Sequence, residues 1–288
     1  MATASMWYWT VAVLGVVMSI DFYLAARNPR RVSSREASIW VAFYILLAIG
    51  FAIVLKFNLS PEASGQFLAG WLTEYSLSID NLFVFLIIFS RLRVPEKSVQ
   101  SVLLIGIALA LILRGLFIAL GALMLHKFVW TFFIFGVFLL FTAGRLLYQG
   151  GGDEDWHEGR VVAFFRRRGI RIFGIAVVAI GTTDLFFALD SIPAIFGLTN
   201  DPYLVFTANA FALMGLRQLY VLLGSLLGRL VHLSKGLAVI LGFIGLKLIS
   251  EGANGPEIGL GITLTVIVLT LVITTIASLR SNPKLELE

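Results

Sequence analysis

The chain has 288 residues, of which 59% are hydrophobic and 14% are charged, and its mean hydropathy is +0.94. A soluble domain has about 25% charged residues, so this composition excludes an ordinary soluble protein and indicates a polytopic membrane protein. The sequence contains no cysteine, which excludes disulfides, thiolate metal sites and iron–sulfur clusters.

Nine apolar segments follow one another along the chain, each near the length of about 20 residues that crosses a bilayer. They cover residues 6–25, 38–56, 66–89, 98–124, 127–149, 171–198, 202–227, 234–250 and 258–279. The pattern predicts an all-α, polytopic membrane helix bundle that forms one transmembrane domain over residues 1–288, with the lipid bilayer as its surroundings.

The basic residues set the predicted orientation. Sixteen Lys and Arg residues lie in the loops after spans 1, 3, 5, 7 and 9, whereas the other four loops hold only Lys56 and Lys127. The positive side of a membrane protein is cytoplasmic, so we expect a cell-membrane protein with its N-terminus outside and its C-terminus inside. This placement also argues against nucleic acid as a partner. The loop at about 150–170 is predicted as a cytoplasmic linker, with metal binding or sensing by its acidic cluster as the alternative.

Four carboxylates lie inside the predicted spans as two matched pairs. Glu74 and Asp80 are six residues apart in the third span, and Asp184 and Asp190 are six residues apart in the sixth. An acid at the centre of a bilayer costs roughly 3 kcal/mol or more, so such residues usually have a function. The duplicated spacing predicts a site for a positively charged ligand. Structural pairing of one or two of these acids with arginine is the alternative.

The similarity between the two halves extends beyond the acids. Arg114 and Arg217 each precede a glycine by seven residues, and the fifth and eighth spans end in AGRLL and GLKLI. We therefore expect residues 66–149 and 171–250 to form a 3+3 inverted repeat, which is the plan of many secondary transporters. In this scheme Arg114 and Arg217 hold the acids in place.

Neutral oxygens accompany the acids. Asn81 and Ser191 each directly follow an aspartate. A set of carboxylate, amide and hydroxyl oxygens suits a hard cation with six ligands. The predicted set is Asp80, Asn81, Asp190 and Ser191, flanked by Glu74 and Asp184.

The spacing within each pair leaves two arrangements open. Six residues of helix span about 9 Å and do not share one face, so the helices are locally unwound or each pair serves two levels. Pro193 favours unwinding of the sixth span, and Ser76, Ser78 and Asn81 are able to support a break in the third.

Two further polar residues are candidates for the site. Asn209, in the seventh span, is predicted to be either a ligand or an interhelical hydrogen-bonding residue. Asp21 lies near the cytoplasmic end of the first span, where we expect a structural or gating pair.

Three long motifs carry a family resemblance that covers most of the chain: EYSLSIDNLFVF, TDLFFALDSIPAIFGLT and FTANAFALMGLRQLY. They resemble the signature segments of the TerC family of integral membrane proteins, whose Alx-like members are manganese exporters and which is related to the LysE group of exporters. The resemblance implies manganese and export. It places Glu74, Asp80, Asn81, Asp184, Asp190 and Ser191 on the family's acidic and polar positions, and Asn209 and Arg217 on the Asn and Arg of the third motif.

The sequence thus predicts a secondary transporter that exports divalent cations by alternating access. It is expected not to be an enzyme and to need no cofactor, with Mn²⁺ as substrate. The phosphate-binding motif GxxxxGK[ST] does not occur, so proton exchange is the simplest energy source. The alternatives are an intramembrane enzyme with an aspartate dyad and a metal-sensing component of a stress complex. The preference among Mn, Ca and Mg and the oligomeric state stay open.

Overall fold

The computed structural model describes residues 3–27, 33–149, 164, 168, 170–226, 232–256 and 258–281. Every element of secondary structure in these ranges is an α-helix. The elements are α1 (Ala4–Arg27), α2 (Ser34–Asn58), α3 (Pro61–Arg91), α4 (Glu96–Lys127), α5 (Trp130–Gln149), α7 (Ile172–Phe196), α8 (Pro202–Leu213), α9 (Leu216–Leu226), α10 (Leu233–Gly252) and α11 (Leu260–Ser281).

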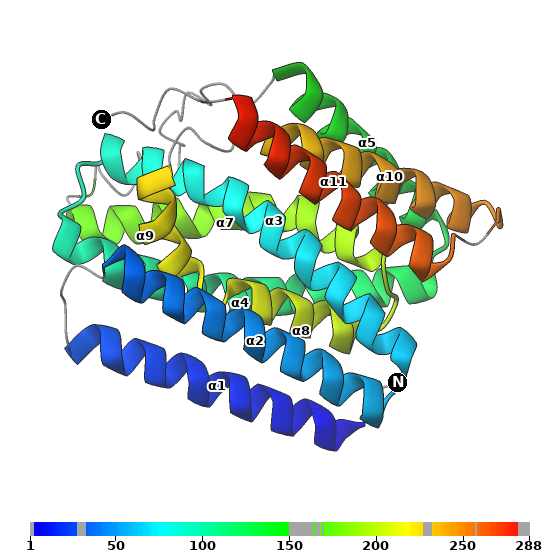
Figure 1. Cartoon of the computed structure of the whole chain (residues 1–288), viewed down its shortest axis with the longest axis horizontal. Coiled ribbons are helices and arrows are strands. Elements are labelled where there is room, and N and C mark those ends of the chain that lie inside the picture. Colours follow the sequence, from blue (N-terminus) through cyan, green and yellow to red (C-terminus); the bar gives the residue numbers. More distant parts are fainter. Residues whose placement is uncertain are drawn as a thin grey trace.

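Within the described ranges, nine segments are long and apolar enough to cross a membrane, and α8 and α9 together supply the seventh. The predicted all-α bundle with nine spans is therefore confirmed. The helices run roughly along one common direction, and α11 ends at the side of the bundle opposite to the start of α1 (Figure 1). The third helix begins earlier than predicted because Ser60 caps it: the Ser60 hydroxyl accepts a hydrogen bond from the Ala63 N–H at 3.0 Å, and Pro61 fits the first turn.

The helices differ strongly in burial. In an apolar window of 18 residues within each span, 83% of residues are buried in the seventh span and 62% in α3, whereas the values are 6% in α1 and 11% in α11. The exposed side chains of the outer helices are large and apolar, as on a surface that faces lipid. The centre of the bundle is thus built from α3, α7 and α8, with α4 packed against them.

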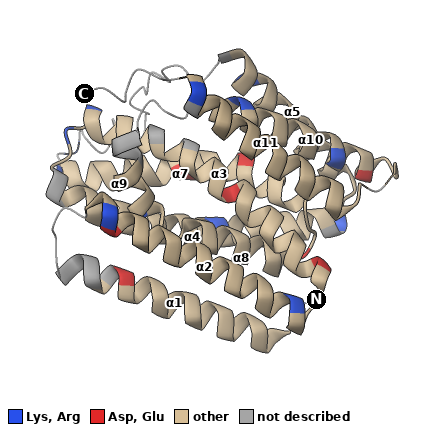
Figure 2. Ribbon diagram, in the orientation of Figure 1, with Lys and Arg blue, Asp and Glu red and all other residues tan. Residues whose placement is uncertain are grey.

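Charged positions are concentrated toward the ends of the bundle, with a small group in its middle (Figure 2). In that middle, the described charged residues Glu74, Arg114 and Asp184 are at most 4% exposed. Burial of charge in a membrane requires close pairing. The fold therefore places a few ionic groups in the middle of the bundle, where burial of charge has the highest free-energy cost.

Among the described residues, the interrupted span is the seventh. Helices α3 and α7 are continuous, which rules out local unwinding near the acid pairs, one of the two arrangements left open above. Pro193 lies inside α7, which continues to Phe196 although proline supplies no N–H. The break lies between α8 and α9, where Gly215 has a φ of 89° that a residue with a Cβ rarely adopts. The glycine in ALMGLRQ was the sequence signal for it.

Candidate functional site

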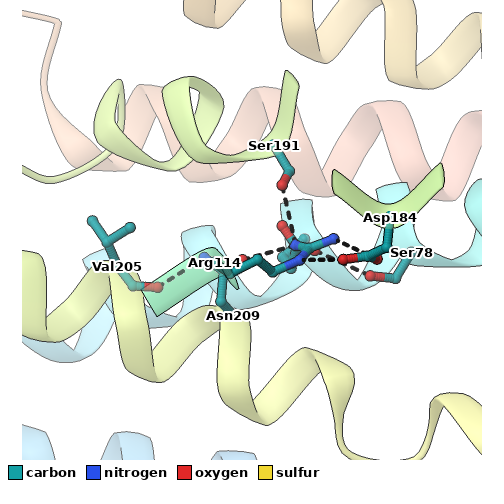
Figure 3. Close-up of polar contacts among 7 residues, drawn as sticks. Ser78, Arg114, Asp184, Ser191, Val205 and Asn209 are labelled. Atoms are coloured by element: carbon teal, nitrogen blue, oxygen red, sulfur yellow. Dashed lines mark hydrogen bonds and ion pairs between the residues drawn. The ribbon is translucent and has the colours of Figure 1, made fainter. Parts of the chain in front are cut away.

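The site is organised around Arg114, which projects from the middle of α4 and is fully buried. Its guanidinium bonds to side chains from three other helices (Figure 3): Glu74 of α3, Asp184 and Ser191 of α7, and Asn209 of α8. One side chain thus ties together the four helices at the centre of the bundle. We call these five residues the Arg114 cluster.

Asp184 is the best-satisfied acid of the cluster. Its Oδ2 accepts from Arg114 Nε at 3.3 Å, and its Oδ1 accepts from Arg114 Nη2 at 3.1 Å. This two-bond geometry is the strong form of an arginine–carboxylate pair. Asp184 therefore serves first as the counter-ion of Arg114.

Glu74 is only half satisfied. Its Oε1 accepts from Arg114 Nη1 and from the Ser78 hydroxyl, which lies 3.1 Å away. Its Oε2 is buried and has no hydrogen-bond partner among the described side chains. A buried acceptor without a partner is costly, so a proton or a cation beside Oε2 would be favourable. With both acids ionised, the cluster also carries one more negative than positive charge.

Two neutral residues complete the cluster. Arg114 Nη1 donates to Asn209 Oδ1 at 2.9 Å and to Ser191 Oγ at 3.1 Å. The Asn209 amide nitrogen donates to the Val205 carbonyl at 2.9 Å, which turns its oxygen toward Arg114 (Figure 3). Asn209 therefore makes the interhelical hydrogen bond that was one of its two predicted roles.

Asp190 lies on another face of α7. Its Oδ1 accepts from the Thr142 hydroxyl of α5 at 3.0 Å, and the residue is half-buried. Its neighbour Ser191 instead faces Arg114. The structure thus does not assemble Asp190 and Ser191 into the predicted oxygen set, because adjacent residues of a continuous helix point in different directions.

The remaining predicted ligands lie on α3. Asn81 is half-buried there, and the side chain of Asp80 lies outside the described residues. In the part of the chain that the structure describes, no three Asp, Glu, His or Cys side chains gather in a group able to hold a metal. Glu74 and Asp184 thus meet at Arg114, and Asp190 lies apart from them.

Arg217, the predicted repeat partner of Arg114, lies in a different environment. Its Nη2 is 2.5 Å from Asp21 Oδ1, and the Gln218 amide nitrogen donates to the same oxygen at 3.2 Å. Asp21 reaches this position from α1 and joins the outermost helix to the start of α9. The acid pairs of α3 and α7 therefore do not share their arginines in the way that the repeat predicts.

Two polar residues of these contacts were missed from the sequence. The only sequence signal for Thr142 was its position as a polar residue in the apolar segment FTAGR, three residues before Arg145. Gln218 directly follows Arg217 and was overlooked beside it. A search for every polar residue within a span, rather than for charges alone, would have found both.

Comparison with known proteins finds similar membrane proteins in several bacteria. An uncharacterized membrane protein of Mycobacterium tuberculosis is 40% identical over 97% of this chain and 80% of its own length. An uncharacterized membrane protein of Myxococcus xanthus is 34% identical over 95% and 92%. The protein named "Putative membrane-bound redox modulator Alx" of Escherichia coli K12 is 32% identical over 97% of both chains. No solved structure matches.

The profile of the integral membrane protein TerC family matches residues 59–285. This range contains α3 to α11 and, with them, every residue of the Arg114 cluster. The chain is a multi-pass integral membrane protein that belongs to the TerC family.

Proposed function

We propose that the protein is a secondary transporter that exports divalent cations, with Mn²⁺ as the favoured substrate, from the cytoplasm by alternating access. It acts without enzymatic chemistry. The observation that carries the proposal is the half-satisfied Glu74 carboxylate in a buried cluster that holds two acids and one arginine. Such a group in the middle of a membrane domain is a place where positive charge is favourable.

Glu74 is the first ligand that we assign. Arg114 binds both oxygens of Asp184 but only one oxygen of Glu74, so Oε2 of Glu74 is the carboxylate oxygen that is open to a cation. A further oxygen would come from Asp80, one to two turns along α3, whereas Asp190 of α7 bonds to Thr142 on another face of its helix. Carboxylate, amide and hydroxyl oxygens favour hard cations such as Mn²⁺, Mg²⁺ and Ca²⁺.

Arg114 has a structural part in this scheme. It neutralises one of the two acids permanently, so that the cluster can fold within the membrane while one negative charge is left for the substrate. A site with both acids unpaired would be too unstable, because each uncompensated buried charge costs several kcal/mol. The arginine thus sets the net charge of the site and does not itself contact the cation.

The packing supports the inverted repeat that alternating access needs. Helix α3 packs along α8 as α4 packs along α7, and α5 lies along α10. In the predicted repeat, α3, α4 and α5 of residues 66–149 correspond to α7, α8 and α10 of residues 171–250. The α3–α8 contact then corresponds to the α7–α4 contact, and the α5–α10 contact corresponds to itself. Rocking one repeat against the other would expose the cluster to each side in turn.

Proton exchange is the proposed energy source. Export against an inside-negative potential requires about 2.3 kcal/mol per charge per 100 mV. The carboxylates that bind a cation must be deprotonated, so a proton and the metal compete for the same oxygens. Inward protons would then return the transporter to its cytoplasm-facing form.

Two other functions are less well supported. The Alx relatives carry the name of a redox modulator. The chain has no cysteine, so a redox role would need a bound redox group. An aspartate dyad on two spans would pair an aspartate of α3 with one of α7. Among the described side chains, Asp184 is bound by Arg114 and Asp190 by Thr142, and the side chain of Asp80 lies outside the described residues. An absorption spectrum of the purified protein would test for a redox group.

The experiment is metal flux in proteoliposomes. Purified protein is reconstituted in vesicles that contain a Mn²⁺-sensitive dye, and Mn²⁺ is added outside with and without a pH gradient. We expect Mn²⁺ flux that a proton gradient accelerates. Flux equal to that of protein-free vesicles under all gradients would contradict the proposal.

A further inference from the structure

A cavity of about 270 Å³ lies beside the break in the seventh span. Its walls come from four parts of the fold: Asp21 of α1, Tyr44 of α2, Ile107 of α4, and Gly215 with Arg217 at the break. A water molecule takes about 30 Å³ in the liquid, so this volume holds several. The cavity is separate from the Arg114 cluster, with which it shares no residue.

Polar groups at this place indicate that the cavity is hydrated. Arg217, in the cavity wall, is 8% exposed, yet its Nε has no hydrogen-bond partner among the described residues. Buried donors and acceptors are normally paired, with protein or with water. Water in a cavity of this size would supply such a partner.

The cavity and the Arg114 cluster are joined by two helices. Ile107 precedes Arg114 by seven residues of α4, which is about 10 Å along the helix. On α8, Asn209 bonds to Arg114, and Met214 in the cavity wall follows it five residues later. Because α4 begins after a loop predicted to be cytoplasmic, the cavity lies between the cytoplasm and the cluster.

One ionic contact lies in the wall of this cavity. Asp21 is held by Arg217 and Gln218, and it belongs to α1, the span with the fewest buried residues. The α8 helix ends at the cavity, and the carbonyl end of a helix favours positive charge. If Asp21 released Arg217, the cavity would offer the Asp21 carboxylate and the Tyr44 hydroxyl. These are oxygen ligands of a hard cation.

We propose that this cavity is the cytoplasmic vestibule of the transport path and that the Asp21–Arg217 pair is its gate. A divalent cation arriving from the cytoplasm competes with Arg217 for Asp21, because it carries twice the charge. Opening of the pair lets the backbone at Gly215 turn and admits the cation toward Glu74. The identity of the ion that passes this gate rests on the proposed function. The existence of a gated aqueous cavity does not.

The absence of native cysteine makes the gate directly measurable. A single cysteine is placed at the cavity by Ile107→Cys, and its matched control is Leu103→Cys, one turn earlier on α4 and buried but not in the cavity wall. A charged thiosulfonate reagent reacts only with a thiolate in water. Labelling rates are measured from each side, in inside-out membrane vesicles and in intact cells.

We expect slow labelling of Ile107→Cys, which Asp21→Asn accelerates at least about tenfold from the cytoplasmic side, with Leu103→Cys unchanged. Asp21→Glu should restore the slow rate. If Asp21→Asn does not yield folded protein, the double variant Asp21→Asn with Arg217→Gln replaces it, because it leaves no unpaired charge. An unchanged rate at Ile107→Cys, or an equal rise at Leu103→Cys, would overturn the gate.

Addition of Mn²⁺ separates the two proposals. If both are correct, Mn²⁺ accelerates labelling of Ile107→Cys while Asp21 is intact. If the neutral variants open the cavity but Mn²⁺ has no effect, the gate stands and Mn²⁺ is rejected as its ligand. If Mn²⁺ flux is normal and labelling never responds to the neutral variants, the transport proposal stands and the gate is rejected.

Discussion

Arg114 and Arg217 occupy corresponding places in the two predicted repeats, but their surroundings differ. Arg114 is fully buried and bonds to four side chains from three helices, whereas Arg217 pairs with one acid of an outer helix beside a cavity. The comparison shows that two arginines with corresponding sequence positions lie in different environments. A guanidinium with many partners fixes a structure, and a guanidinium with one ionic partner can be released from it.

The largest expected effect is that of Arg114→Ala. The change leaves Glu74 and Asp184 buried without a counter-ion, and breaking a buried pair in this way costs about 3–5 kcal/mol. We expect little folded protein, measured by thermal unfolding and gel filtration in detergent. Adding Glu74→Gln and Asp184→Asn to the same chain should restore much of the stability, and failure of this rescue would contradict the ionic explanation.

Arg217→Ala should have a smaller effect on stability. Asp21 is partly exposed beside the cavity, so water can take the place of the lost partner. We expect a cost of about 1–2 kcal/mol, in the range of a single lost charged hydrogen bond. The same unfolding assay compares it with Arg114→Ala, and equal losses for the two variants would abolish the distinction between a fixed and a releasable arginine.

Two glycines beside these arginines sharpen the comparison. At Gly215 a Cβ would lie 3.0 Å from the Tyr44 ring, and the φ of 89° is strained for alanine. At Gly115, next to Arg114, the nearest atom would be 3.7 Å away. Gly215→Ala should therefore destabilise by about 1 kcal/mol or more, whereas Gly115→Ala should be neutral or slightly stabilising. Melting temperatures check the difference, and a harmless Gly215→Ala would argue against a constrained break.

The smallest effect is expected at the contact between Asp190 and Thr142. Thr142→Val removes one hydrogen bond of about 1 kcal/mol, and the half-buried Asp190 can turn to other partners. We expect near-normal folding and a change of Mn²⁺ flux below about tenfold. Loss of all flux in a well-folded Thr142→Val protein would mean that Asp190, rather than the Arg114 cluster, holds the substrate.

The fold was readable from the sequence because it rests on strong local signals. Runs of about 20 apolar residues gave all nine spans, since burial in lipid leaves little alternative to a helix. The four acids also stood out, because charge within a span is rare. Ser60 and Pro61 form a capping pattern that marks the start of α3, but this pattern was not used in the prediction.

The sequence did not predict which of the polar residues lie together in the site. Which acid faces which arginine depends on the rotation of each helix about its axis, and tertiary packing sets that rotation. Asp190 and Ser191 are neighbours in sequence but contact α5 and α4, respectively. The break at Gly215 was missed because Pro193 is the stronger local signal for a helix interruption, yet α7 accommodates it.

The central claim is that the open oxygen of Glu74 binds the transported cation. Mn²⁺ binding to the purified protein, followed by the loss of the free-ion paramagnetic resonance signal, tests it in Glu74→Gln. Glutamine keeps an oxygen for Arg114, so this variant should fold. Glu62→Gln, at the exposed start of the same helix, is the control. We predict at least tenfold weaker binding in Glu74→Gln and wild-type binding in the control. Wild-type affinity in folded Glu74→Gln would contradict the claim.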